Sequence, residues 1–184
     1  MSFRVIPNVI NRREAILLAG ITDRYVVQRG KRAIEPERKA AVYHPMPGVL
    51  EGKETKLIES TVRRGIEKLA DHYSFKPEES NKEWVQRCMD SMIFEFAHYE
   101  KGDWFHPHAD TDYFGDFPVL SMSVPLTLPN LGGALCIQGR HVQYQLTTGL
   151  IWPSTTRYEI DTVEGGTLRM LNILFYSSPG KIKK

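Results

Sequence analysis

The stretch from Ser91 to Asp110 reads SMIFEFAHYEKGDWFHPHAD, and the hydrophobic period of the sequence changes there. Its first half alternates as a β-strand does, with Met92, Phe94 and Phe96 on one side. Similar short runs, separated by turn residues, continue almost to the end of the chain. They fall at about 104–109, 119–128, 134–138, 141–146, 149–152, 157–163 and 167–176. Many short strands at such close spacing predict a sandwich or a barrel.

The chain before this stretch has a helical or irregular pattern. Asn11 is placed to cap a short first helix. Apolar residues at helical spacing predict a longer helix at about 54–73, and a third helix is expected at about 80–89. The segment 30–53 is rich in Pro and Gly, which predicts loops there.

Helices that precede a run of strands indicate one sheet assembly braced by helices, not alternating βαβ units. At 184 residues the chain falls in the range of a single domain that can bury a core. We therefore predict an α+β, mainly β fold in one domain, 1–184. Its parts are a helical and irregular support region at 1–90, a strand core at 91–176 and a basic tail at 177–184.

Composition excludes few classes of protein. The formal charge of +2 neither requires nor excludes nucleic acid as a partner. Cys88 and Cys136 are far apart and form no CxxC pair, so both are interpreted as small buried residues and not as a zinc knuckle or a disulfide. The sequence shows no signal-peptide pattern and no apolar run long enough for a membrane span. A cytoplasmic protein is therefore the default expectation.

Two histidines and a carboxylate, His106, His108 and Asp110, close the stretch quoted above. Residues two apart on an extended segment point to the same side, so His108 and Asp110 can reach one metal ion. Two imidazoles and one carboxylate on one face of iron(II) leave the opposite positions open for an oxo acid and dioxygen. The His-x-Asp pair supplies two of these three ligands, although the spacing by itself is common.

A wider pattern surrounds this pair. The spacing Y-x-x-G-x-x-F-x-x-H-x-D is fitted by Tyr99, Gly102, Phe105, His108 and Asp110. It resembles the iron-site entry of the prolyl-hydroxylase-like branch of the non-haem Fe(II)/2-oxoglutarate-dependent dioxygenases. Two later stretches, LSMSVPLTLPNLGGAL and GLIWPSTTRYEIDTVEGGTLRMLNILFY, are similar to strands of that family and to its closing hairpin. The resemblance covers about half the chain and implies a double-stranded β-helix (jelly-roll) core braced by the N-terminal helices.

The same resemblance implies Fe(II) and 2-oxoglutarate as cofactors, with ascorbate as a further candidate in the role of reductant. In that family an arginine of the closing hairpin binds the far carboxylate of 2-oxoglutarate, and Arg169 matches it. A guanidinium suits this role because it pairs with a carboxylate through two parallel hydrogen bonds. Tyr99 resembles the family tyrosine that helps to hold the oxo acid. Further hydrogen bonds are expected from Ser121, Ser123 or Asn172.

The second histidine ligand of the family is missing. Tyr158 stands where the pattern places that ligand, five residues after Pro153. Glu159 takes the place instead if an extra residue before Arg169 is absorbed elsewhere than at the Gly turn, and His106 is another candidate. Three hypotheses stay open: an altered iron site, a weak two-ligand site, and a fold that binds a ligand or partner without chemistry.

We therefore predict an oxygenase that hydroxylates an aliphatic C–H bond of a peptide, an amino acid or a small molecule. The alternative is a pseudo-enzyme, or a binding protein with a degraded metal site. Aromatic residues near the metal motif, Trp104, Tyr113 and Phe114, are candidates for the rim that contacts substrate. Asp112 and Asp116 make this rim acidic, which disfavours phosphate-rich ligands such as nucleic acid. The sequence does not indicate an oligomeric state.

Overall fold

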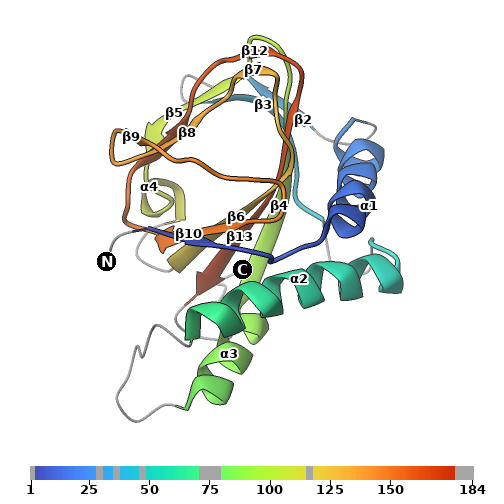
Figure 1. Cartoon of the computed structure of the whole chain (residues 1–184), viewed down its shortest axis with the longest axis vertical. Coiled ribbons are helices and arrows are strands. Elements are labelled where there is room, and N and C mark those ends of the chain that lie inside the picture. The colour runs from blue at the N-terminus through green and yellow to red at the C-terminus, as the bar shows by residue number, and fades with distance from the viewer. Residues whose placement is uncertain are drawn as a thin grey trace.

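The structure is a computed structural model that describes residues 3–27, 31–34, 38–45, 49–70, 80–114 and 118–176. The basic tail expected at 177–184 lies outside the described residues. Within the described part, the strands form a strongly curled antiparallel sheet, and the longer helices cover its outer side (Figure 1). None of the helices in these ranges is long and apolar enough to cross a membrane.

The described strands form one large sheet and one small one. The large sheet has the order β1-β10-β6-β13-β4-β3-β5-β11-β8-β9, with β2 beside β3, and the small sheet pairs β12 with β7. The bounds are β1 Arg4–Ile6, β2 Lys31–Ile34, β3 Arg38–Tyr43, β4 Met92–Tyr99, β5 Trp104–His108, β6 Pro118–Thr127, β7 Leu131–Gly132, β8 Leu135–Ile137, β9 Arg140–His141, β10 Gly149–Pro153, β11 Tyr158–Ile160, β12 Val163–Gly165 and β13 Leu168–Tyr176. Side chains along each strand therefore alternate between the interior of the curl and its outer surface.

Helices brace the sheet from outside. They are α1 Arg12–Thr22, the π-helix η1 Asp23–Val27, α2 Gly52–Ala70, α3 Asn81–Asp90 and the single turn α4 Thr111–Phe114. Capping boxes begin two of them, at Asn11 for α1 and at Ser80 for α3. The long helix α2 turns Ile58, Val62 and Ile66 into the core, where all three are fully buried. Its position follows from this apolar stripe, which has the helical period.

Two apolar cores lie on the two sides of the curled sheet. The outer core packs the helices against the sheet and includes Leu171 and Ile173 of β13. The inner core includes Leu168 and Met170 of the same strand. Successive residues of β13 therefore serve opposite faces, and the parity of a residue decides whether it enters the barrel.

The mainly β prediction with a helical brace is confirmed. Two predictions about strands are wrong. Part of the segment interpreted as loops, 30–53, forms β2 and β3, and β3 pairs with β4 and β5 in the large sheet. The strand expected at 141–146 ends at His141, and the chain then makes a turn in which Thr148 N–H donates to Gln145 C=O. The Pro and Gly residues near β3 predict loops, and the strands β4 and β5 that pair with β3 lie far along the chain. The local sequence therefore does not indicate a strand.

Candidate metal centre

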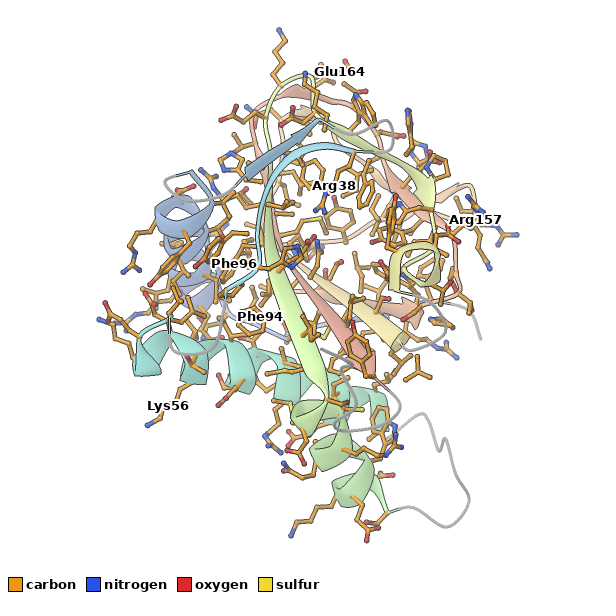
Figure 2. The ribbon with its side chains drawn as sticks, turned by 180° about the vertical axis from the view of Figure 1, so that it is seen from behind. Arg38, Lys56, Phe94, Phe96, Arg157 and Glu164 are labelled. Carbon is orange, nitrogen blue, oxygen red and sulfur yellow. The ribbon has the colours of Figure 1, made fainter. Side chains whose placement is uncertain are left out.

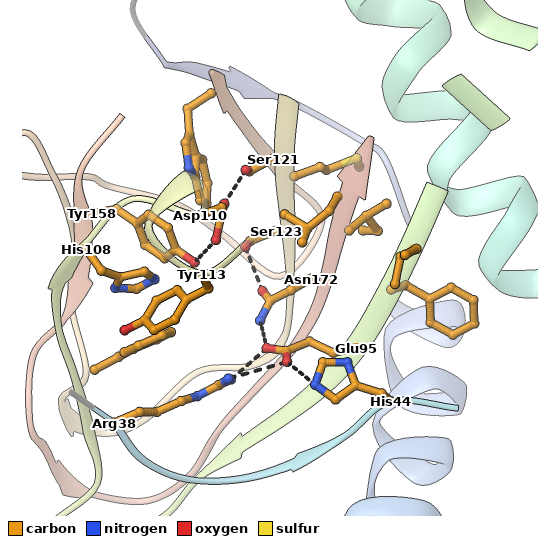
Figure 3. Close-up of a pocket in the computed structure, with 17 residues that line it drawn as sticks. Arg38, His44, Glu95, His108, Asp110, Tyr113, Ser121, Ser123, Tyr158 and Asn172 are labelled. Atoms are coloured by element: carbon orange, nitrogen blue, oxygen red, sulfur yellow. Dashed lines mark hydrogen bonds and ion pairs between the residues drawn. The ribbon is translucent and has the colours of Figure 1, made fainter. Parts of the chain in front are cut away.

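A cavity of about 200 Å³ lies inside the curled sheet (Figure 3). Its wall is mostly apolar and carries polar groups in two places. One place contains His108 and Asp110, and the other contains a buried ion pair between Arg38 and Glu95. An apolar cavity with a few converging polar groups is the usual form of a small-ligand site.

His108 presents a free ring nitrogen at this cavity. It ends β5, and its Nδ1 lies 2.7 Å from the carbonyl oxygen of His106, which accepts a hydrogen bond from Nδ1–H. The other nitrogen, Nε2, is buried and has no hydrogen-bond partner in the described part of the chain. Burial lowers the pKa of His108 to about 4, so the ring is neutral at pH 7. A neutral imidazole with its other nitrogen tied to a carbonyl is the form in which histidine binds metals.

Asp110 lies beside this histidine, and two hydroxyl donors hold its carboxylate. Ser121 donates to Oδ2, and the phenol of Tyr158 donates to Oδ1 at 3.0 Å. The Oγ of Ser121 is also 2.9 Å from the Oγ of Ser154, so a chain of hydroxyls supports the carboxylate. Burial raises the pKa of Asp110 to about 6 despite the two hydrogen bonds. The carboxylate is thus oriented but poorly solvated, a state that a bound cation stabilises.

Tyr158 completes the group from β11, where it lies opposite His108 in the strand register. The centroids of the two rings are 4.3 Å apart. Burial, followed by the charge of Asp110, raises the pKa of Tyr158 well above its ordinary value. Without a cation the phenol therefore keeps its proton and acts as a donor to Asp110. The structure brings His108, Asp110 and Tyr158 together at one cavity.

The second polar group is a partly buried network around Glu95 of β4 (Figure 3). Arg38 reaches from β3 into the interior of the curl (Figure 2), and its Nη2 lies 2.6 Å from Glu95 Oε1. Asn172 donates to the same oxygen at 3.0 Å, and His44 Nε2 lies 3.2 Å from Oε2. The hydroxyl of Tyr99 lies 3.4 Å from Arg38 Nη2. Burial would raise the pKa of Glu95, but the charge and hydrogen bond of Arg38 outweigh burial and leave that pKa below its ordinary value.

Arg169 does not lie at this cavity, contrary to the expectation from sequence. Its Nε donates to Asp23 of η1 at 2.6 Å, and its Nη1 donates to Thr167 at 2.9 Å. The physical reason is strand parity, since Arg169 shares the outer face of β13 with Leu171, which packs against the helices. Leu168, one residue earlier, faces the inner core. Arg169 therefore does not line the cavity, and Asp23 balances its charge on the outer face.

His106, another candidate for the missing ligand, does not share a side of β5 with His108. The pairing of β5 with β11 shifts between Phe105 and His108, as it does at a β-bulge. The ring of His108 therefore stacks on Phe105, with centroids 3.6 Å apart. His106 instead stacks on Trp104 at 4.1 Å, and neither of these two residues borders the cavity. His106 is thus removed as a third ligand, and Trp104 as part of the rim.

The remaining candidates lie on both faces of the sheet. Glu159 faces outward because it alternates with Tyr158 on β11, so it is not a third ligand in the cavity. Tyr113 of α4 borders the cavity, with its ring centroid 5.4 Å from that of His108. The side chain of Phe114 lies outside the described residues. Ser121 and Asn172 both line the cavity, where Ser121 donates to Asp110 and Asn172 donates to Glu95.

Sequence reasoning missed the pair formed by Arg38 and Glu95. A signal for Glu95 was present, since this carboxylate alternates with Ile93 and Ala97 on an apolar strand, where a buried charge needs a partner. Nothing local marks Arg38 as that partner. It lies 57 residues away, in the segment whose chain breakers predicted loops.

Several solved structures share this fold. A Pseudomonas putida prolyl-4-hydroxylase has a TM-score of 0.68 at 16% sequence identity, covering 96% of this chain and 92% of that one. The viral collagen prolyl hydroxylase of Paramecium bursaria Chlorella virus-1, in its 2OG complex, has a TM-score of 0.66 at 15% identity over 97% of both chains. A Trichoplax adhaerens prolyl hydroxylase in complex with a hypoxia inducible factor peptide fragment has a TM-score of 0.68 at 14% identity, covering 95% and 83%.

These likenesses confirm the predicted jelly-roll double-stranded β-helix. At identities this low they establish the fold alone. Neither a protein-family model nor a curated protein matches the sequence of this chain.

Proposed function

We propose that this chain is an oxygenase that uses Fe(II) and 2-oxoglutarate, with the metal bound by His108 and Asp110. One observation carries the proposal: the Nε2 of His108 is buried and lacks a partner among the described residues, at a cavity that also holds an oriented carboxylate. Buried polar atoms in folded proteins nearly always have a hydrogen-bond or metal partner, so the unpaired Nε2 of His108 indicates a ligand. The fold shared with prolyl hydroxylases supports the same class.

The donor set fits iron(II). Imidazole nitrogen and carboxylate oxygen are the ligand types of the facial arrangement that leaves positions open on the metal. Tyr158 is our candidate for the third place, because its hydroxyl lies 3.0 Å from Asp110 Oδ1 and its ring centroid lies 4.3 Å from that of His108. A phenol is a weak ligand until it loses its proton, so the charge of the metal has to displace that proton. If the proton stays, Tyr158 acts as the donor that orients Asp110.

Arg38 takes the role that sequence reasoning assigned to Arg169. It is a buried guanidinium at this cavity, and its Nε has no hydrogen-bond partner in the described ranges. Five N–H donors allow one guanidinium to serve both Glu95 and the far carboxylate of an oxo acid. Because Glu95 already balances the charge of Arg38, we expect 2-oxoglutarate to bind more weakly here than beside an unpaired arginine.

Bound iron in this class supplies oxidative decarboxylation of the oxo acid and insertion of one oxygen atom into an aliphatic C–H bond. The residues of the chain prepare the site for that chemistry. Hydroxyl donors orient Asp110, and a backbone carbonyl fixes the tautomer of His108. Phe105 and Trp152 line the cavity with apolar surface, which disfavours water near the metal. The substrate is a peptide, an amino acid or a small molecule whose aliphatic part fits a space of about 200 Å³.

The test begins with the full chain under anaerobic conditions. Fe(II) and 2-oxoglutarate are added, and the weak visible charge-transfer absorption of the complex is recorded. Oxygen and ascorbate are then admitted, and succinate is measured. We expect both signals in the parent protein and in His106→Ala, and neither in His108→Ala. We also expect Arg38→Gln to lower both signals and Arg169→Gln to keep them. Absence of both from the parent chain, with their appearance in Tyr158→His, would identify a site that has lost its chemistry.

A further inference from the structure

The β8–β9 hairpin lies at one end of the large sheet (Figure 1). A second group of ligand-type side chains lies near this hairpin. Cys136 of β8, His141 of β9 and Asp161, which follows β11, place one ligand atom each within 4.8 Å of the others. The Sγ of Cys136 lies 3.8 Å from Asp161 Oδ2, and His141 Nε2 lies 3.7 Å from the same oxygen. None of the three residues lines the cavity that contains His108.

Strand register gathers these side chains on one face. Cys136 pairs directly with His141 on one side and with Glu159 on the other. Directly paired residues project from the same face of a sheet, and Asp161 follows Glu159 by two positions, so it projects there as well. The flanking residues of β8 confirm the direction, since Leu135 and Ile137 belong to the inner core. Four potential ligands therefore face outward together.

The spacing suits a tetrahedral ion. Zinc bonds of about 2.3 Å to sulfur and about 2.0–2.1 Å to nitrogen or oxygen place neighbouring ligand atoms roughly 3.3–3.6 Å apart. Two of the three separations, 3.7 and 3.8 Å, exceed this range by only a few tenths of an ångström, and the third, between Cys136 and His141, is within 4.8 Å. Small rotations of the side chains of His141 and Asp161, which are 71% and 41% exposed, close the difference.

We propose that Cys136, His141 and Asp161 bind a divalent transition-metal ion of the zinc type, at a site separate from the cavity. A thiolate and an imidazole together select zinc, cobalt(II) and related ions over magnesium or calcium. Glu159 adds negative charge on the same face, and water takes the fourth position. The exposed His141 gives the ion an entry path, whereas the sulfur belongs to a residue that is only 3% exposed and is shielded from oxidants.

In the metal-free form of this group, the proton of the Cys136 thiol forms a hydrogen bond to Asp161. Burial, and then the charges of Asp161 and Glu159, raise the pKa of the Cys136 thiol to about 11. The thiol therefore keeps its proton and donates a hydrogen bond to Asp161. Metal binding breaks the S–H bond, forms an S–metal bond and releases one proton to solvent, with no change of oxidation state. The ion would then join β8 and β9 to the end of β11, the strand whose Tyr158 points the other way into the cavity.

The experiment titrates Co(II) into the full, reduced, metal-free chain and follows the near-ultraviolet absorption of a thiolate–cobalt bond. The cavity contributes nothing to this signal, because its lining contains no cysteine among the described residues. We expect saturation at one equivalent of thiolate-bound cobalt and release of one proton. The same signal is expected in His108→Ala, which disables the cavity site, and in Cys88→Ser, which removes the buried thiol of α3.

The variants of the outer group decide the outcome. Cys136→Ser should abolish the absorption. The side chain of His141 is 71% exposed, so His141→Ala leaves the fold intact and should weaken Co(II) binding at least about 10–100-fold. Zinc should displace the cobalt and raise the Tm of the parent chain more than that of His141→Ala. A parent chain without the absorption, a signal that survives in Cys136→Ser, or unchanged affinity in His141→Ala would each overturn the proposal.

Discussion

Tyr158→His is the substitution that tests the cavity site most sharply. It places an imidazole on β11 directly opposite His108, at a position whose present ring centroid is 4.3 Å from that of His108. The variant carries two imidazoles and the carboxylate of Asp110, the ligand set of a facial iron site. It loses the hydrogen bond from the phenol to Asp110, but Ser121 still donates to that carboxylate.

The magnitude follows from the proton on the phenol. An ordinary phenol has a pKa near 10, so its use as phenolate at pH 7 costs about 3 pKa units, or about 4 kcal/mol. This cost is a lower limit, because burial raises the pKa of Tyr158 well above its ordinary value. Histidine, with an ordinary pKa near 6.5, binds at pH 7 almost without this cost. An imidazole is shorter than a phenol and so recovers only part of the cost. We expect affinity to rise at least about tenfold, and about a thousandfold if the gain reaches about 4 kcal/mol.

The assay uses Mn(II), which prefers oxygen and nitrogen donors and so avoids the outer thiol. Free Mn(II) is followed by electron paramagnetic resonance during titration of the metal-free protein. Tyr158→Phe is the matched control, because it removes the oxygen and supplies no new ligand. We expect the order of affinity to be Tyr158→His, then the parent chain, then Tyr158→Phe. Equal affinity in all three proteins would refute the reasoning, because residue 158 would then not face the metal.

Three further predictions concern stability and the two arginines. The first concerns the metal-free protein. Folding raises the pKa of Asp110 from 3.8 to about 6, so this group lowers the free energy of unfolding as pH rises between those values. Folding lowers the pKa of His108 from 6.5 to about 4, so this group raises the free energy of unfolding as pH rises between 4 and 6.5. The two trends offset each other in the parent chain. Asp110→Asn removes the first trend, so urea denaturation should show the free energy of unfolding rising on the order of 3 kcal/mol over pH 4–6.5. A free energy of unfolding that does not change over this range would contradict a neutral His108 ring. Arg38→Met leaves Glu95 buried without its cation and should cost about 3–5 kcal/mol, most of which the double change with Glu95→Leu should recover; no recovery would argue against the pairing. Arg169→Gln should cost about 1 kcal/mol or less, because its partner is half exposed, and should leave succinate formation unchanged; a loss of succinate without unfolding would return Arg169 to the active site.

Sequence reasoning reached His108 and Asp110 because their relation is local. A single residue separates them at the end of β5, and the alternating strand β4 precedes them closely in the sequence. Tyr158 is different, since only the order of the later motifs indicates that it faces this pair, and the sequence left Glu159 and His106 as alternatives. A register shift in β5 and the parity of β11 decide among these three residues, and neither can be read from local spacing.

Arg169 shows a different limit. The alternation of Arg169 with Leu171 and Ile173 is visible in the sequence, but the side of the sheet that forms the barrel interior is not. That side is fixed by α1 and η1, which cover the outer face and supply Asp23, a residue 146 positions away. Long-range packing of this kind also hid Arg38, because the hydrogen bonds that make β3 a strand come from β4 and β5.

The central claim is that a metal ion sits between His108 and Asp110 inside the barrel. Crystals of His141→Ala, which lacks a ligand of the outer site, soaked anaerobically in Fe(II), allow an anomalous difference map at the iron absorption edge. We expect one peak in the cavity, within bonding distance of His108 Nε2 and of the Asp110 carboxylate. A map with no peak there, although the crystals are saturated with iron, would contradict the account.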